Sequence, residues 1–411
     1  MKYSLRAAVV LFLGVCTTVQ AQQTLLLRQP DISDQHLTFV YAGDVWVTSR
    51  DGSEPRRLTS SPGSESRPVF SPDGQQIAYS ASFENNADVY VIDVDGGQPT
   101  RLTWHPGADM PTGWTATGDA VTFVSARETD HGRSGQLYQV STNGGMPTKR
   151  MEARVYQGVY DATDSRFAYI AFRPAYNGLF GGSSGWRGYR GGSVPAIQVM
   201  EMGAQSVTTI PGADATNFNP IWNGDELYFI SDRDNKILNL FRYDASSGDV
   251  QKVSAEDTWD VRAAGGHDGT IVYEAGGRLK SIDVASGATQ EIAISISPDL
   301  PQLRTQWKNA GRTIQAADIS PTGKRAIVTA RGEVFTVPVE DGSTRNISNT
   351  GNAREYTALW SPSGDEVAYI VDSLAGQKLV VTGQTGMGDS QEYELGEFFY
   401  TLTDWSDGDV P

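Results

Sequence analysis

The sequence predicts an all-β protein made of repeated four-stranded units. Three observations support this fold class: a recurring turn motif, hairpin glycines with a matching spacing, and the absence of helical periodicity beyond the N-terminal stretch. A unit that returns at roughly forty-residue intervals predicts a repeat architecture. Apolar residues at i, i+3, i+4 and i+7 would indicate amphipathic helices, and no segment shows that pattern.

The turn motif is clearest at Phe70–Gly74, which reads FSPDG and precedes the short apolar strand Ile77–Tyr79. Good copies occur at 319–323 and 360–364, and weaker ones at 114–118 and 222–224. Pro and Gly favour a turn into the next strand. The aromatic residue before the turn is expected to fill space between neighbouring units.

The first unit is predicted from four short apolar segments: Leu25–Leu27, Leu37–Tyr41, Val45–Val47 and Arg57–Thr59. Asp51-Gly52 lies between the last two, and such a pair between short strands is a strong hairpin signal. The unit therefore reads as one four-stranded meander.

The glycine of this last hairpin marks every unit along the chain. The marker glycines are Gly52, Gly96, Gly144, Gly203, Gly248, Gly287, Gly342 and Gly383. By subtraction, their intervals are 44, 48, 59, 45, 39, 55 and 41 residues. Most of these match the length of a four-stranded β-propeller blade.

The two long intervals predict the domain organisation. One contains the Gly-rich insertion Asn177–Gly192, in the fourth repeat, and the other contains the Pro-bearing stretch Ile296–Asn309. We therefore expect a six-bladed propeller at 24–295, a linker at 296–313 and the start of a second propeller at 314–411. Two full repeats follow the linker and Leu402–Asp409 opens a third, so this second propeller is expected to be incomplete. Two blades alone would leave strand edges and apolar faces uncovered, which favours a longer protein.

Residues 1–21 resemble a secretory signal peptide. Lys2 and Arg6 precede the apolar run 7–15, and Val19-Gln20-Ala21 is a typical cleavage site. We expect a periplasmic or secreted protein that is cleaved after Ala21. The alternative is a lipoprotein signal at Cys16, although Val15 is larger than the residue usual before a lipidated cysteine. Cys16 is the sole cysteine, so no disulfide is expected in the mature chain.

Charge and motif content exclude several function classes. The formal net charge is −16, with no basic cluster, so neither nucleic acid nor an anionic membrane surface is an expected partner. No later stretch is long and apolar enough for a membrane span.

The sequence also lacks the motifs of several kinds of site. The four histidines, His36, His105, His131 and His267, lack metal-ligand spacing. No phosphate loop or dinucleotide motif is present, so no cofactor is expected. A G-x-S-x-G match around Ser183 lacks the strand and helix that a nucleophile elbow needs.

The insertion supplies the candidate site residues: Trp186, Arg187, Tyr189 and Arg190. Two guanidinium groups beside two aromatic rings could hold a peptide, because Arg pairs bidentately with carboxylates. Alternatively, both Arg side chains pair with acidic neighbours and the aromatic rings pack the insertion onto its blade.

The repeats and the insertion together resemble a known family. The SPDG-type units resemble TolB-like propeller repeats. The opening LLLRQPDI at 25–32, the segments 37–40 and 44–46, and GYRGG at 188–192 resemble the N-terminal region of the tricorn proteases. The resemblance implies a six-bladed propeller followed by the first blades of a seven-bladed one.

In that family the catalytic Ser, His and Glu residues lie C-terminal to both propellers, so the resemblance transfers no catalytic residue to this chain. The resemblance implies that this chain is the non-catalytic propeller part of a secreted serine peptidase. The role of this part would be to filter peptides and channel them to the catalytic domain. The expected partners are peptides or unfolded polypeptide segments and the peptidase domains of the same polypeptide, with homo-oligomerisation left open. The alternative is a TolB-like periplasmic scaffold that binds proteins. A prolyl-oligopeptidase-type propeller is disfavoured by the second run of repeats.

Overall fold

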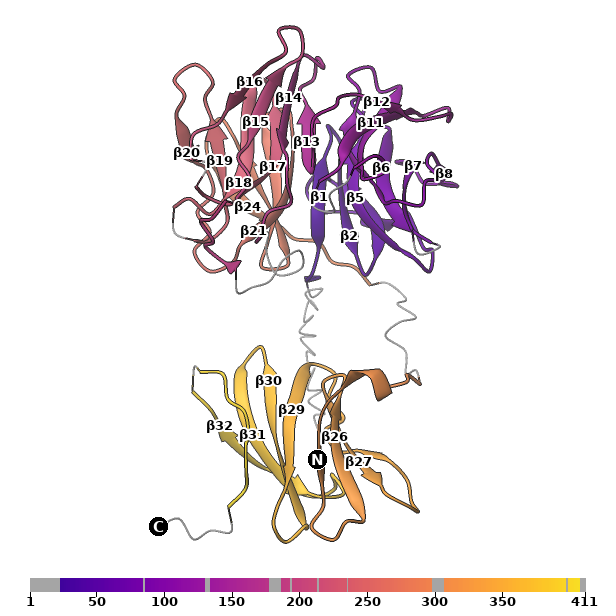
Figure 1. The fold of residues 1–411 in the computed structure, drawn as a ribbon, viewed down its shortest axis with the longest axis vertical. Helices are drawn as coiled ribbons and strands as arrows, with labels where there is room; N and C mark the ends of the chain where they lie inside the picture. The colour runs from indigo at the N-terminus through magenta and orange to yellow at the C-terminus, as the bar shows by residue number, and fades with distance from the viewer. Residues whose placement is uncertain are drawn as a thin grey trace, which may run out of the picture. The chain divides into compact units, whose positions relative to one another are not determined.

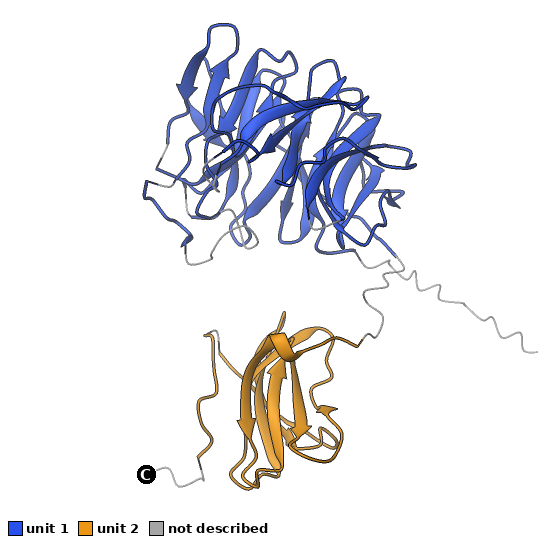
Figure 2. Ribbon diagram, turned by 45° about the vertical axis from the view of Figure 1, so that its right-hand side comes forward, with its two compact units in different colours: residues 1–298 blue, residues 299–411 orange. Residues whose placement is uncertain are grey.

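The computed structural model describes residues 23–83, 86–129, 134–176, 186–192, 194–212, 214–234, 236–297, 307–396 and 398–406. The expected signal peptide, Cys16, His131 and Ser183 lie outside these residues, as does part of the expected linker. The chain forms two compact units, residues 1–298 and 299–411 (Figure 2). Among the described residues, the strands form eight four-stranded antiparallel sheets, which confirms the predicted all-β propeller fold (Figure 1).

The first unit contains six of these sheets, each built from four consecutive strands. Blades 1 to 3 comprise β1 Arg28–Ile32, β2 His36–Tyr41, β3 Asp44–Ser49, β4 Arg56–Arg57, β5 Ser64–Phe70, β6 Gln76–Ser82, β7 Ala87–Asp93, β8 Thr100–Arg101, β9 Asp109–Trp114, β10 Ala120–Ser125, β11 Gln136–Ser141 and β12 Thr148–Lys149. Blades 4 to 6 comprise β13 Gln157–Tyr160, β14 Arg166–Ile170, β15 Gln198–Glu201, β16 Ser206–Thr209, β17 Asn217–Asn223, β18 Glu226–Ser231, β19 Asn239–Tyr243, β20 Val250–Lys252, β21 Val261–His267, β22 Thr270–Ala275, β23 Arg278–Asp283 and β24 Thr289–Ile292.

The second unit contains two blades. They comprise η3 Gly311–Thr313, β25 Ile314–Ile319, β26 Arg325–Ala330, β27 Glu333–Pro338, β28 Arg345–Asn346, β29 Ala353–Trp360, β30 Glu366–Ser373, β31 Gly376–Gly383 and β32 Gln391–Glu394. A buried cluster that includes Ile327, Trp360 and Tyr369 joins the blades. The described part of the expected third repeat, up to residue 406, contains no strand.

The turn motif has the structural role that the sequence predicts. Phe70 ends β5 and is buried among apolar side chains of blades 1 and 2. The Ser71 hydroxyl accepts a hydrogen bond from the Gln76 amide at 2.9 Å, and the Gly74 amide donates to the Ser71 carbonyl at 2.8 Å. Gly74 has a φ of +68°, a conformation that a residue with a β-carbon rarely adopts. The motif therefore closes the turn between the first and second strands of a blade.

One predicted strand is wrong: Leu25–Leu27 is not the first strand of blade 1. The first strand is β1, Arg28–Ile32, and residues 23–27 have no regular structure. Instead, this segment packs onto blade 6. The Thr24 amide donates to the Ile294 carbonyl at 2.8 Å, and the Leu27 amide donates to the Gly277 carbonyl at 3.2 Å.

Blades 1 and 6 close the ring without exchanging strands. Leu27 is fully buried in a cluster that contains Phe39 of blade 1 and Val272 of blade 6. The backbones of the two blades also approach closely, because a β-carbon on Gly265 in β21 would lie 2.8 Å from the Asp31 Cα. A side chain at position 265 would therefore push the seam apart.

Candidate functional site

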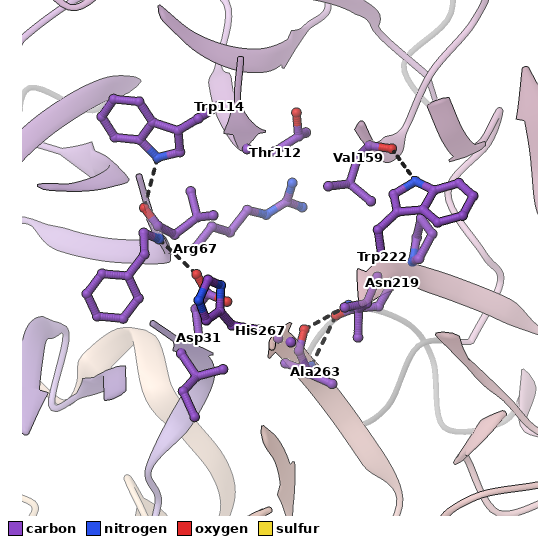
Figure 3. A pocket seen from close by; sticks show the side chains of 18 of the residues that line it. Asp31, Arg67, Thr112, Trp114, Val159, Asn219, Trp222, Ala263 and His267 are labelled. Carbon is purple, nitrogen blue, oxygen red and sulfur yellow. Dashed lines mark hydrogen bonds between the residues drawn. The ribbon is translucent and has the colours of Figure 1, made fainter. Parts of the chain in front are cut away.

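A central cavity of about 940 Å³ runs through the six-bladed unit. Its wall contains residues of the first strand of every blade, β1, β5, β9, β13, β17 and β21. The volume lies within the range of roughly 300–1,000 Å³ that is common for ligand sites. This cavity is the candidate functional site (Figure 3).

Three of these inner strands carry a β-bulge at an X-Pro pair whose first residue has a positive φ. Gln29, Arg67 and Asn219 each precede a proline and have φ values of 51°, 54° and 53°. The strand register shifts at each of these places. Bulges re-aim side chains, and within sheets proline is tolerated mainly at edges and bulges.

Amide side chains at the cavity wall bond to the backbone of the next blade. The Arg67 amide donates to Gln29 Oε1 at 2.8 Å, and the Asn219 amide donates to Gln157 Oε1 at 2.9 Å. Asn219 Nδ2 donates to the Ala264 carbonyl at 2.9 Å. These bonds satisfy backbone groups at the bulges and hold neighbouring blades in register.

Two indole rings add blade-to-blade hydrogen bonds. Trp114 Nε1 donates to the Val69 carbonyl at 3.1 Å, and Trp222 Nε1 donates to the Val159 carbonyl at 3.2 Å (Figure 3). Both Trp residues belong to the weaker copies of the turn motif. These bonds satisfy the indole N–H groups and join blade 3 to blade 2 and blade 5 to blade 4.

Charged groups of the wall gather around the buried carboxylate of Glu274. Its Oε1 lies 3.7 Å from Arg28 Nε and 3.9 Å from Arg262 Nη1, and its Oε2 accepts the Gln29 amide at 3.0 Å. Burial raises the pKa of Glu274, and the two guanidinium groups oppose that shift. The Glu274 carboxylate therefore lies within ion-pair distance of both guanidinium groups.

Asp31 is a second unusual group of the wall. Its Oδ2 accepts the Phe70 amide of blade 2 at 2.8 Å (Figure 3). Desolvation by the surrounding protein raises the pKa of the Asp31 carboxyl to about 7, although the hydrogen bonds from Phe70 and Ile32 act in the opposite direction. Part of the side chain still faces the cavity.

The raised pKa of Asp31 predicts a pH dependence of stability. The folded state holds this proton more tightly than the unfolded state, where the carboxyl has its ordinary pKa of 3.8. Asp31 therefore makes the folded protein lose stability as the pH rises from about 4 to about 7. We expect Asp31→Asn, which keeps an acceptor for Phe70, to reduce this loss. The free energies of unfolding in urea at pH 4.5 and pH 8 measure this loss in both proteins. The same pH dependence in Asp31→Asn and in the unmodified chain would contradict the role of Asp31. Glu65, with a pKa also raised to about 7 by burial and by Asp44, is expected to supply the residual loss.

The four candidate residues of the insertion lie outside the cavity wall. Arg187 forms an ion pair and hydrogen bonds with Asp260, a buried residue just before β21, and Arg190 Nη1 lies 3.0 Å from Oδ2 of buried Asp232. The Trp186 and Tyr189 rings contact edge to face, with centroids 4.9 Å apart. Acidic pairing of both Arg side chains, the alternative considered above, is thus present. Peptide contact by these four residues stays a prediction.

The cavity residues were missed because their partners lie in other blades. One local signal was available, because Gln29, Arg67 and Asn219 each precede a proline. An internal proline there indicates a bulge. Pro68 and Pro220 each lie two residues before a copy of the turn motif, at Phe70 and Trp222, and this equal spacing could have located two strands of the wall.

The structure offers no metal centre and no membrane helix within its described ranges. No group of three or more His, Cys, Asp or Glu residues there is arranged to hold a metal ion. No described helix is long and apolar enough to cross a membrane.

Comparisons with known proteins agree with the propeller architecture. Residues 24–288 match the family model of the tricorn protease N-terminal beta propeller domain. A tricorn protease homolog of Saccharolobus solfataricus is 22% identical over 360 residues, covering 87% of this chain and 32% of the relative. Tricorn protease homolog 1 of Streptomyces coelicolor is 25% identical over 366 residues, covering 88% of this chain and 33% of the relative.

The chain thus spans about a third of the length of these relatives. The crystal structure of the tricorn protease superimposes with a TM-score of 0.59 at 18% identity, over 88% of this chain and 44% of that chain. Because the family model covers most of the six-bladed unit, this chain belongs to the family of tricorn protease N-terminal β-propeller domains.

Proposed function

We propose that this chain is the non-catalytic propeller part of a secreted, tricorn-like serine peptidase, and that its central cavity passes peptides to or from a catalytic domain. The observation that carries the proposal is the cavity of about 940 Å³, whose wall contains residues from all six inner strands. Membership of the tricorn propeller family supports the peptide class of ligand.

The wall chemistry suits an extended polypeptide. Gln, Asn and Arg side chains offer donors and acceptors, and Trp, Val and Pro side chains offer apolar surface. Such a mixture can bind a peptide backbone without demanding one sequence. The closed ring would also exclude folded proteins, because they are too large for a cavity of this size.

A narrowed cavity tests the proposal. Thr112 lies on the wall, whereas Thr208 is an exposed residue of the outer strand β16. We expect Thr112→Trp to weaken binding of a short, neutral, fluorescein-labelled peptide by about tenfold or more, because the indole fills the passage. Thr208→Trp is the matched control and should leave the affinity unchanged. Fluorescence anisotropy measures both.

Equal affinities for Thr112→Trp and Thr208→Trp would contradict passage through the cavity. Failure of the unmodified chain to bind any peptide, combined with stable capture of folded envelope proteins, would favour the scaffold function instead. The same peptide titration with Trp186→Ala tests whether the insertion contacts the peptide. Trp307 is fully exposed, so Trp307→Ala is the control for loss of an exposed indole.

The remaining parts of the proposal concern location and assembly. Secretion rests on the sequence of residues 1–21, and N-terminal sequencing of protein exported from a bacterial host tests it by showing whether the mature chain begins at Gln22. Association with peptidase domains and with further copies of the chain rests on family membership. Light scattering of the purified chain tests the self-association.

A further inference from the structure

Arg67 is the feature of the cavity that blade packing does not explain. It occupies the bulge of β5, and Figure 3 shows its guanidinium pointing into the centre of the cavity. The side chain is partly exposed there. Its backbone amide is satisfied by Gln29 Oε1 at 2.8 Å, so the backbone is fixed independently of the side chain.

In blades 1 and 5, the corresponding bulge positions carry amide side chains that join one blade to the next. Gln29 bonds to the Arg67 amide, and Asn219 bonds to Ala264. A guanidinium has only donors, so it cannot accept a backbone N–H in this way. Among the described residues, Arg67 makes no such blade-to-blade bond with its side chain. A glutamine would serve the fold at least as well.

Arg67 also differs from the other cationic groups of the wall. Arg28 and Arg262 share the buried carboxylate of Glu274. No carboxylate of the described residues lies within ion-pair distance of Arg67, in a chain whose formal net charge is −16. The guanidinium is therefore an uncompensated cation inside a partly desolvated passage, where a charge interacts more strongly than on an open surface.

We propose that Arg67 binds the carboxylate group of a peptide inside the cavity. The planar guanidinium can donate two parallel N–H bonds to one carboxylate, which gives both strength and orientation. The positive bulge φ of 54° holds its Cα at the wall, so that the side chain reaches inward. This inference rests on the proposed peptide function, and it adds a preference for acidic groups. The carboxylate can belong to a Glu or Asp side chain or to a peptide C-terminus.

Arg67→Gln tests the proposal in the complete 411-residue chain. Glutamine occupies the equivalent bulge at Gln29, so the fold should be kept, and urea unfolding checks this. Arg312→Gln removes the same charge at an exposed residue of the second unit and is the matched control. Arg67→Lys keeps the charge but removes the bidentate fork, and it should retain part of the affinity.

Three fluorescein-labelled peptides of otherwise identical sequence separate the sources of the carboxylate. The first has a central Glu and an amidated C-terminus, the second has Gln and a free C-terminus, and the third has Gln and an amidated C-terminus. We expect Arg67→Gln to bind at least one of the first two about tenfold more weakly than Arg312→Gln does. Affinity for the third peptide should be the same in both variants. A loss confined to the first or to the second peptide identifies the side chain or the C-terminus as the source.

Two results would overturn the inference. One is an equal affinity of Arg67→Gln and Arg312→Gln for both carboxylate-bearing peptides. The other is an equal loss for all three peptides, which would indicate a change of cavity shape. In either case, the proposed function would stand if the unmodified chain still bound the third peptide, which carries no carboxylate. No binding of any peptide would refute the proposed function, and this inference with it.

Discussion

Leu27→Ala is expected to destabilise the six-bladed unit by about 2–5 kcal/mol, because it creates a cavity where the ring closes. Leu27 is completely buried between blades 1 and 6, and its cluster includes Leu279 and Ile292 of blade 6. The substitution keeps the hydrogen bond from the residue 27 amide to Gly277, so the lost packing accounts for the effect. The free energy of unfolding in urea measures it.

The neighbouring residue provides the control. Leu26 is 70% exposed, and alanine keeps a β-carbon at its φ of 67°, so the backbone strain does not change. We expect Leu26→Ala to alter the free energy of unfolding by less than about 0.5 kcal/mol. Hydrogen exchange should localise the effect of Leu27→Ala to amides on both sides of the seam, such as those of Thr24 and Ile296. Similar losses in the two variants would contradict the role of Leu27.

Asp260→Ala is the second substitution with a large expected effect, a loss of about 3 kcal/mol. Asp260 accepts hydrogen bonds from the Tyr176 hydroxyl, from Arg187 and, at 3.0 Å, from the buried Leu238 amide. Alanine leaves these donors without their acceptor. The estimate lies at the lower end for a buried ion pair because the Arg187 side chain is 40% exposed and can be solvated.

The pH dependence of this effect has a defined sign. Burial alone would raise the pKa of Asp260, but the hydrogen bonds from Arg187, Tyr176 and Leu238 outweigh it and hold the pKa below its usual range. The stabilisation is therefore present above a pH of about 4 and is lost as the pH falls. Asp257→Ala, at an exposed position three residues earlier, is the control. The loss in free energy of unfolding caused by Asp260→Ala should be smaller at pH 3 than at pH 7. An equal loss at both pH values would exclude the charged form of Asp260 as its source.

The blade pattern could be predicted because each blade is encoded locally. Seven of the marker glycines lie in the turn between a third and a fourth strand, and Gly383 ends β31. Hairpins and tight turns depend on residues adjacent in sequence, so a single chain is sufficient to locate them. The buried aromatic residues before three of the turns, Phe70, Trp114 and Trp360, were predictable for the same reason.

The first strand was not predictable from apolar character. Residues 28–32 read RQPDI and contain one aliphatic residue, whereas the preceding three residues are all Leu. The inner strand of a propeller faces a polar cavity, so its side chains need not be apolar. The Leu segment is apolar because Leu27 packs against another blade, 245 or more residues away in sequence.

The cavity wall was not predicted, for a related reason. The insertion was conspicuous because its sequence is unusual, and its two Arg side chains proved to pair with Asp232 and Asp260. Arg67 was inconspicuous because the Arg-Pro pair marks only a bulge in its strand and says nothing about the partners of its side chain. That no described carboxylate pairs with it is a property of six strands brought together, and no local pattern in one blade reveals it.

Closure of the ring without strand exchange has a consequence for the synthesis of the protein. Within the described ranges, Thr24 forms its hydrogen bonds with residues 294 and 296, so the seam cannot form until nearly 300 residues have left the ribosome. At about 5–20 residues per second, this delay lasts on the order of tens of seconds. During that time the seam face of blade 1, which contains Leu37 and Phe39, is open to water. The nascent chain therefore presents this face to chaperones before the last blade covers it.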